Sequence, residues 1–315
     1  MNQRGIFVVG SLNADLVQNV PRLPNPGETI QGSDLRMFSG GKGANQACAA
    51  ARLGGTVRMA GRVGNDVFGS RLQSELKAAG VDISRIGISS QSTGAATIFV
   101  LPSGENVIVL SPGANADVSA SFAIGALEDA TPGNLLLCQL EIPPETVFAT
   151  LKAARARGMY TILDPAPARP IPAECFADLD VLTPNQSEAA AIVGVHTADI
   201  VSMQNATAAA AALLRKGPAA VILKMGELGC LVATPQRALE VTGHAVEAVD
   251  TTAAGDAFNG ALAVALAEGA DLFEAARFAN GAAALSVTQA GAIQSMPDRA
   301  TLRKFLHLHS AVPGD

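Results

Sequence analysis

Tryptophan is absent from the 315-residue sequence, tyrosine occurs once, and aromatic residues make up only 4% of the chain. Charged residues are also sparse, at 16%, while hydrophobic residues reach 49%. This composition excludes a disordered chain and favours a well-buried domain whose core is built from small side chains. The length allows one large α/β domain or two small ones.

A basic surface for nucleic acid is missing, because the net charge is −6. We therefore expect no nucleic-acid partner, and we expect local donors to hold any anionic ligand. No run approaches the ~20 apolar residues of a membrane span, and Ile6–Val9 is too short for the apolar region of a signal peptide. A cytoplasmic protein with no membrane partner is the expectation.

Cysteine and histidine are scarce, with four of each, and neither set has the spacing of a metal site. The cysteines form no C-x-x-C pair, so a zinc cluster is not expected. Buried free thiols in a reducing compartment are the simplest interpretation. The histidines show no pairing and are interpreted as surface or structural residues.

Short apolar runs alternate with helical segments along most of the chain. The runs Ile6–Val9, Leu135–Cys138 and Val221–Leu223 are typical of buried strands, and Pro144–Arg157 and Ala206–Lys216 are typical of the helices between such strands. This alternation predicts an α/β fold with a mainly parallel sheet and helices on both faces. Three C-terminal helices are predicted at Ala254–Glu268, Leu272–Ser286 and Pro297–His307.

Two segments break this alternation. Residues 14–37 contain Pro21, Pro24 and Pro26 among alternating apolar residues, and residues 93–110 are typical of a hairpin with a Pro-Ser-Gly-Glu turn. Together the two segments are expected to form a small separate sheet. Neither an internal repeat nor a linker is visible, so residues 1–315 are predicted to form a single domain.

A glycine-rich segment, GGKGANQA at residues 40–47, leads into a helix predicted at Ala44–Leu53. Glycine lets the backbone approach a ligand closely, and the start of a helix offers free N–H donors. The segment is not a Walker A loop, because Gly43 follows Lys42, and not a dinucleotide fingerprint, because Gln46 replaces the last glycine. A tight strand–helix turn without a ligand is the alternative.

A second segment, DTTAAGDAFNGA at residues 250–261, contains the start of a helix near Ala254. The first N–H groups of that helix can point at one anion, and the helix dipole favours negative charge there. Asp256 lies on the first turn, where its carboxylate can face both the anion and a substrate hydroxyl, so it is the candidate catalytic base. The dipole is expected to lower the pKa of Asp256 and so to make it a weak base. Asp256 would then contribute to catalysis mainly through its position beside the hydroxyl. The alternative makes Asp250 or Asp256 a helix cap.

Other polar residues follow predicted strands, at the sheet edge where open α/β proteins bind ligands. Asn185 and Glu188 follow one strand; Glu188 could hold Mg²⁺ through water, and a capping box is the alternative. Asn13 and Asp15 follow the first strand and could bind sugar hydroxyls or form Asx turns. Lys224 stands at the end of another strand.

With these segments in place, the chain resembles the ribokinase family of carbohydrate kinases from residue 8 to Gly291. Both family signatures, residues 40–47 and 250–262, are present in the same order. The resemblance implies a doubly wound α/β domain with a small β-sheet lid over the sugar, and a homodimer joined through the lids. It also implies an ATP-dependent kinase that converts D-ribose at its 5-hydroxyl to ribose 5-phosphate and ADP.

The resemblance further implies roles for individual residues. The anion hole matches Ala253, Ala254, Gly255 and Asp256, and Asp256 matches the catalytic base. The sugar-binding matches are Asn13, Asp15, Gly41, Lys42, Asn45, Glu141 and Asp256. The ATP-binding matches are Asn185, Lys224, Gly226, Gly255 and Asn280. Besides Mg²⁺ with ATP near Glu188, a monovalent cation, usually K⁺, would be bound by Asp250, Ser295 and the carbonyls of Thr252, Ser286, Gln289 and Gly291.

Two positions depart from the family pattern. Lys224 stands where ribokinases often have threonine, and Asp164 stands where asparagine often precedes the segment Pro165–Arg169. Both are expected to lie away from the sugar-binding residues. The substrate alternatives left open are another pentose, a ketohexose or a nucleoside. A sugar-binding regulator without turnover is the alternative of a different class, and the retained Asp256 with its full anion hole argues against it.

Overall fold

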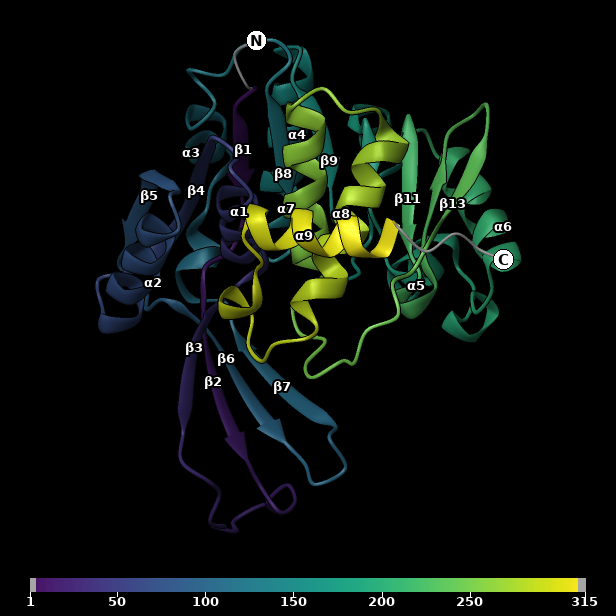
Figure 1. Cartoon of the computed structure of the whole chain (residues 1–315). Helices are drawn as coiled ribbons and strands as arrows, with labels where there is room; N and C mark the ends of the chain where they lie inside the picture. Colours follow the sequence, from purple (N-terminus) through teal and green to yellow (C-terminus); the bar gives the residue numbers. More distant parts are fainter. Residues whose placement is uncertain (1–3, 311–315) are drawn as a thin grey trace.

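The computed structural model describes residues 4–310. Its main feature is a nine-stranded sheet in the order β13-β12-β11-β10-β9-β8-β1-β4-β5, with helices on both faces (Figure 1). Strands from β11 to β5 pair in parallel, and β12 and β13 continue the sheet antiparallel at one edge. The predicted doubly wound, mainly parallel sheet is confirmed. The strands are β1 (Ile6–Val9), β4 (Val57–Gly64), β5 (Asp82–Ser89), β8 (Leu135–Cys138), β9 (Tyr160–Leu163), β10 (Val181–Leu182), β11 (Ala220–Lys224), β12 (Gly229–Ala233) and β13 (Ala238–Thr242).

Apolar side chains cover both faces of this sheet. Along β1, Ile6 and Val8 belong to one core cluster and Phe7 and Val9 to the other, because successive side chains of a strand point to opposite faces. A sheet buried on both sides needs continuous apolar strands, which is why the short apolar runs predicted it. One cluster is packed by α1 (Lys42–Arg52), α2 (Val67–Ala78), α7 (Ala254–Ala267), α8 (Leu272–Ser286) and α9 (Arg299–Ser310), and the other by α3 (Ala120–Gly125), α4 (Pro144–Ala156), α5 (Gln186–Val193) and α6 (Met203–Leu214).

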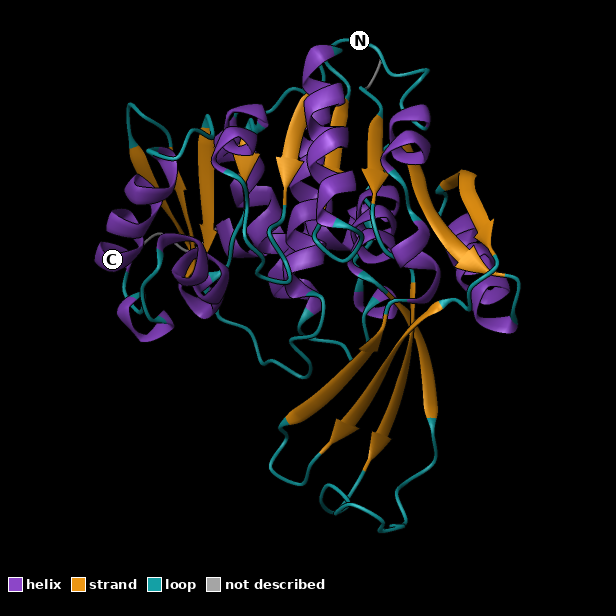
Figure 2. Ribbon diagram, turned by 180° about the vertical axis from the view of Figure 1, so that it is seen from behind, coloured by secondary structure: helices purple, strands orange, loops and turns teal. Residues whose placement is uncertain are grey.

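A second, four-stranded sheet projects from the edge at which the parallel strands end (Figure 2). Its order is β3-β2-β6-β7, and the predicted hairpin is its β6–β7 pair. Strand β3 runs beyond residue 37, where the predicted segment ended, and leads directly into α1. The strands are β2 (Asn13–Asn19), β3 (Arg36–Gly40), β6 (Gly94–Val100) and β7 (Asn106–Ser111).

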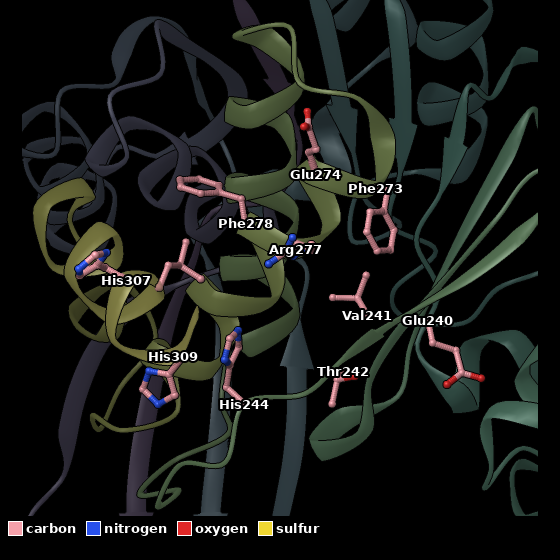
Figure 3. Close-up of a pocket in the computed structure, with 11 residues that line it drawn as sticks. Glu240, Val241, Thr242, His244, Phe273, Glu274, Arg277, Phe278, His307 and His309 are labelled. Atoms are coloured by element: carbon pink, nitrogen blue, oxygen red, sulfur yellow. The ribbon is translucent and has the colours of Figure 1, made fainter. Parts of the chain in front are cut away.

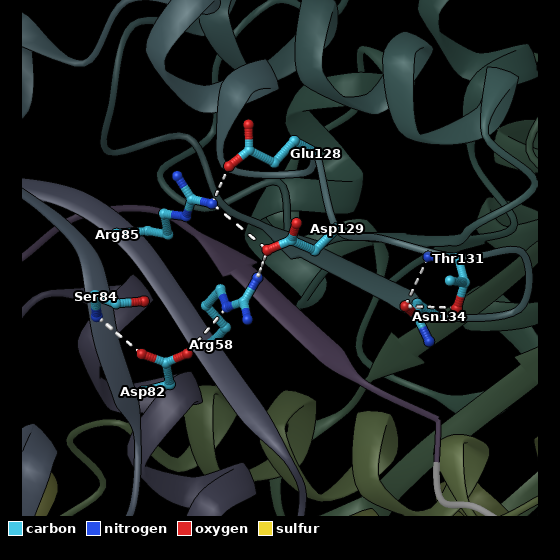
Figure 4. Close-up of polar contacts among 8 residues, drawn as sticks. All are labelled: Arg58, Asp82, Ser84, Arg85, Glu128, Asp129, Thr131 and Asn134. Carbon is cyan, nitrogen blue, oxygen red and sulfur yellow. Dashed lines mark hydrogen bonds and ion pairs between the residues drawn. The ribbon is translucent and has the colours of Figure 1, made fainter.

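Charged side chains gather at the opposite edge, where β4, β5 and β8 begin (Figure 4). Arg58 contacts Asp82 and Asp129, each at 3.0 Å, and Arg85 contacts Asp129 and Glu128. The pairs join residues in the first half of β4 and β5 to the segment that precedes β8. Because the acidic partners are largely exposed and the arginines are only partly buried, each pair contributes little stability.

Some elements were not predicted. Strand β5 has the sequence DISRIGIS, whose polar residues hide the apolar alternation, and β12 and β13 were not recognised as an antiparallel edge. Helix α1 begins at Lys42, two residues before its predicted start at Ala44. Across residues 4–310, no helix has the length and apolar character needed to cross a membrane.

Candidate active site

Polar residues that follow the parallel strands line a cleft of about 1220 Å³. The cleft lies where β9, β10 and β11 end, against the first turn of α7, as expected for an open α/β sheet. It brings together eleven of the residues singled out from the sequence. These are Lys42, Asp164, Asn185, Glu188, Lys224, Gly226, Ala253, Ala254, Gly255, Asp256 and Asn280.

Asp256 is buried, with 3% of its surface exposed, on the first turn of α7. Asn45 Nδ2 donates to its Oδ2 and Gln46 Nε2 donates to its Oδ1, each at 2.9 Å. Both donors come from α1, so the glycine-rich segment and α7 meet at this carboxylate. Asp256 does not cap α7, whose N-cap is Ala253 and has no side-chain capping bond; the helix-cap alternative for Asp256 is therefore wrong.

Burial raises the pKa of Asp256 above its ordinary value, and the Asp164 carboxylate adds to the rise, although Lys42 opposes it. The expectation of a lowered pKa is wrong, because removal from water, the largest effect, raises it. A carboxylate with a raised pKa is a stronger base than an exposed aspartate.

The turn before α7 has a strained backbone. Ala253 has a φ of 61° and is the only non-glycine residue with positive φ among residues 4–310. The left-handed conformation costs alanine roughly 1–2 kcal/mol. The turn exposes the first N–H groups of α7, which have no intrahelical partner, and such a concave backbone binds anions.

The glycine-rich segment packs against the end of β1. Gly41 is the N-cap of α1, with a φ of 88°. A methyl group on Gly43 would lie 2.7 Å from the backbone of Gly10 and Ser11, so only glycine fits there. Lys42 N–H and the Ser11 hydroxyl both donate to Glu141 Oε2, at 3.0 and 2.5 Å. The segment is thus a tight turn, as in the ligand-free alternative, and it also places polar groups beside Asp256.

The remaining sugar-binding candidates gather where the small sheet joins the large one. Asn13 pairs with Gly40 across β2 and β3, and its Oδ1 accepts from Asn115 Nδ2 at 2.7 Å. Asn115 also accepts from Leu12 N–H, yet nothing in its local sequence marked it. Within the described chain, the buried Asn45 Oδ1 has no hydrogen-bond partner, so it is available to a ligand.

Carboxylates outnumber cations around this group. Burial, Glu141 and Asp256 raise the pKa of Asp15 to about 7, although Lys42 opposes the rise. Burial disfavours the charge of Lys42, but the carboxylates of Asp256, Asp164 and Glu141 raise its pKa above the usual value. Lys42 is thus held as a cation among negative groups.

Asn185 and Glu188 form the capping box that was the alternative interpretation of this pair. Glu188 N–H donates to Asn185 Oδ1 at 2.8 Å, and Asn185 N–H donates to Glu188 Oε2 at 2.7 Å. Burial and Asp164 raise the pKa of Glu188, although Lys224 opposes the rise. The carboxylate nevertheless borders the cleft, so the capping bonds do not remove it from the ligand side.

Lys224 and Asp164 form an ion pair inside the cleft. Lys224 Nζ lies 3.0 Å from Asp164 Oδ1, and Gln46 Nε2 donates to Asp164 Oδ2 at 2.9 Å. Asp164, one of the two departures from the family pattern, was expected to lie away from the sugar-binding residues, and this expectation is wrong. Gln46 Nε2 donates to both Asp164 and Asp256. Neither Gln46 nor Asp164 had been assigned a site role from the sequence.

Asp250 ties the turn before α7 to the segment after α8. Its Oδ1 accepts from Thr252 N–H and its Oδ2 from Gly291 N–H, both at 2.9 Å. Partial burial acts in the opposite direction, but these bonds lower the pKa of Asp250. Of the other cation candidates, Ser286 is the last residue of α8, and Gln289 and Ser295 lie on the segment after it. Gln289 N–H donates to Ser286 O.

A second hollow, of about 620 Å³, lies between β13, α8 and α9 (Figure 3). His244 packs edge-on against Phe305 and His309, with ring centroids 5.1 and 5.4 Å apart. The structure thus pairs two histidines that showed no pairing in the sequence. Among residues 4–310, no group of three or more histidine, cysteine or acidic side chains could hold a metal ion.

The chain is similar in sequence and in structure to known carbohydrate kinases. The model of the pfkB family carbohydrate kinases matches residues 3–299. The ribokinase of Haemophilus influenzae is 39% identical over 305 residues, covering 96% of this chain and 99% of its own. The structure of Arabidopsis thaliana ribokinase complexed with ribose and ATP superposes with a TM-score of 0.89 at 33% identity, covering 97% of this chain and 99% of its own. The deoxyribokinase of Salmonella typhimurium is 34% identical, covering 96% of this chain and 99% of its own.

Proposed function

Because the chain belongs to the pfkB family of carbohydrate kinases, we propose that it transfers the γ-phosphoryl group of ATP to the 5-hydroxyl of D-ribose. The products are ribose 5-phosphate and ADP. The chain is an ATP-dependent sugar kinase. The choice of mechanism rests on Asp256, which is buried on the first turn of α7 and accepts hydrogen bonds from two side-chain amides.

Asp256 acts as the general base. It takes the proton of the sugar hydroxyl as the hydroxyl oxygen attacks the γ-phosphorus and the bond to the bridging oxygen of ADP breaks. The amides of Ala253–Asp256 hold the phosphoryl oxygens while charge builds on them. The protein contributes position and electrostatics, which is the usual logic of phosphoryl transfer.

Ribose is bound where the two sheets meet. Asn13, Asp15, Gly41, Lys42, Asn45 and Glu141 contribute the polar contacts, in addition to Asp256. The unpartnered Asn45 Oδ1 supports this assignment, because a buried amide oxygen without a partner is costly unless a ligand supplies one. The four-stranded sheet forms a lid over the sugar.

ATP occupies the cleft between α5 and α7, contacted by Asn185, Lys224, Gly226, Gly255 and Asn280. Glu188 fits Mg²⁺ held through water, since its oxygens border the cleft but are already occupied by Asn185. When bound, Mg²⁺ neutralises phosphate charge. The oxygen-rich loops around Asp250 fit a monovalent cation, with Ser295 and the carbonyls of Thr252, Ser286, Gln289 and Gly291 as the other ligands.

A second substrate, 2-deoxyribose, is favoured by one observation, the 34% identity to a deoxyribokinase. Release of ADP by the purified protein, measured with ribose, 2-deoxyribose, fructose and adenosine, tests both proposals. We expect the highest kcat/KM for ribose, and mass spectrometry with ³¹P NMR should place the phosphate on the 5-hydroxyl. A higher kcat/KM for 2-deoxyribose would identify 2-deoxyribose, and not ribose, as the preferred substrate. If no sugar led to ADP release, the kinase mechanism would be overturned in favour of a binding protein.

A further inference from the structure

A buried ion pair lies between the nucleotide side of the cleft and the catalytic base. Asp164 is 1% exposed, and its carboxylate accepts from Lys224 on one oxygen and from Gln46 on the other. A buried charge of this kind is costly unless it is paired and hydrogen-bonded. Each of the two charges therefore depends on the other for its stability in this site.

Gln46 joins the pair to the base. Its Nε2 donates to Asp164 Oδ2 and to Asp256 Oδ1, each at 2.9 Å, and its Oε1 accepts from Gln139 Nε2 at 2.6 Å. Two carboxylates can only accept, so the amide nitrogen must face them, and Gln139 holds the amide oxygen on the other side. Both hydrogens of one NH₂ group are thus divided between Asp164 and Asp256.

Lys224 places its charge at the anion hole. A methyl group on Gly255 would lie 3.3 Å from Lys224 Nζ, so the ammonium lies against the backbone that would hold the phosphoryl group. An ammonium has three hydrogens, and the bond to Asp164 uses one of them. The others are available for phosphate oxygens.

We propose that Asp164 and Lys224 act as a positioning pair that holds an ammonium group beside the anion hole and couples it through Gln46 to Asp256. Lys224 contacts the phosphate oxygens, and Asp164 acts through Lys224 and Gln46 without touching substrate. This inference rests on the proposed function of Asp256 as the base.

The pair should govern the pH dependence of turnover. The charged groups facing Asp256 are Lys42 on α1, Asp15 on β2, Asp164 after β9 and Lys224 on β11. Asp164→Asn removes a negative charge within about 6 Å of the base and leaves Lys224 uncompensated, so Asp256 stays ionised to lower pH. The acid limb of kcat/KM for sugar should move down by roughly one pH unit.

The matched variants are Lys224→Met, Lys224→Arg and the double variant Asp164→Asn/Lys224→Met. We expect Lys224→Met to lower kcat by about tenfold or more, since removing one charge-stabilising donor typically costs ~10²–10³. It should weaken ATP binding more than ADP binding. Lys224→Arg keeps the charge and should keep the parental acid limb. The double variant has no buried charge in the pair, so it should fold as well as the parent. Because it removes one negative and one positive charge near Asp256, its acid limb should return towards the parental pH.

An acid limb unmoved by Asp164→Asn, or single effects on kcat that combine within about twofold of additivity in the double variant, would overturn the coupling. If a single variant fails to fold, the comparison of the double variant with Lys224→Arg and the parent still decides: equal kcat and equal ATP affinity in all three would exclude a role for the pair. Asp256→Asn is measured in the same assay. If it keeps parental turnover, the proposed base is wrong; if it loses turnover while Asp164→Asn changes nothing, only the coupling fails.

Discussion

At the scale of single residues, Asp256 differs from the other carboxylates of the cleft in having two side-chain amide donors and a place on the first turn of α7. Asp256→Asn keeps the backbone and the size but removes the proton acceptor. We expect kcat to fall ~10²–10⁴-fold, the usual contribution of a general base. Sugar and ATP affinities should change far less, since most of the proposed contacts come from other residues. Steady-state kinetics and equilibrium binding on this variant check both statements.

Asp271→Asn is a suitable control for that experiment. Asp271 also stands at the start of a helix, where its side chain accepts from Phe273 and Glu274 N–H, and asparagine caps helices equally well. Its kcat should equal the parent's. A parental kcat in Asp256→Asn as well would remove Asp256 from the mechanism.

Asp15 gives the folded chain a pH dependence near neutrality. Because its pKa is raised from 3.8 to about 7, the folded chain binds this proton more tightly than the unfolded chain, and stability falls as pH rises between those two values. Asp15→Asn carries no charge and should gain stability over the parent above pH 7, by on the order of 4 kcal/mol. Urea unfolding at pH 5 and pH 8, without ligands, measures the difference. An equal difference at both pH values would contradict the raised pKa.

At the scale of elements, the segments around α7 and α8 are joined by one side chain. Asp250 accepts from Thr252 before α7 and from Gly291 after α8. If a monovalent cation completes this junction, K⁺ should raise kcat well above the value in Na⁺ or tetramethylammonium by ordering the anion hole. Asp250→Ala should abolish the response to K⁺. Rates measured at constant ionic strength test it.

Asp250→Asn separates the two contributions of this residue, because an asparagine oxygen can keep one of the two backbone bonds while the negative charge is lost. Its kcat should retain a reduced K⁺ response. Equal parental rates in all three cations would exclude a cation site here.

Elements that are buried on both faces could be predicted from the sequence more easily than elements at the edge of the sheet. Strand β1 is a continuous apolar run because both of its faces are buried, so its sequence was sufficient to predict a strand. Strand β5, at the edge of the sheet, is half-exposed along much of its length, and its polar residues removed the pattern. The start of α1 was misplaced because Gly41 enters the helix through a positive φ, which the residue type permits but does not require.

At the scale of the whole molecule, the small sheet presents apolar side chains to solvent. Ile108, Val109 and Leu110 on β7 are each more than half exposed, at 54%, 57% and 51%. Exposed apolar strands at a sheet edge favour pairing with another chain, as in the homodimer that the family resemblance implies. Val109→Lys should weaken that dimer, and analytical ultracentrifugation at micromolar concentration should show a shift towards monomer.

Val201→Lys provides the control, since Val201 is 61% exposed but lies before α6, outside the small sheet. It should sediment as the parent does. A parent that is itself monomeric at micromolar concentration would contradict the homodimer.

The site was predictable to the extent that local sequence carries it. Asp256 and Asn45 lie in segments whose glycines and helix start point to a ligand, and the structure brings them into contact. Asn115, Gln46 and Asp164 escaped assignment because their partners lie up to 210 residues away in sequence, and only the packing of strands and helices brings them together. The residue type at one position does not reveal which distant residues it contacts in the folded chain.

The left-handed Ala253 has a consequence for engineering. Glycine at this position would relieve roughly 1–2 kcal/mol of backbone strain, but the unfolded chain would gain freedom that costs about 0.4–1 kcal/mol. The net gain is on the order of 1 kcal/mol or less, so Ala253→Gly should raise the melting temperature by a few degrees at most, while it loosens the turn of the proposed anion hole. A search for better variants that ranks them by heat resistance alone would therefore give this position little weight, although it lies in the proposed anion hole.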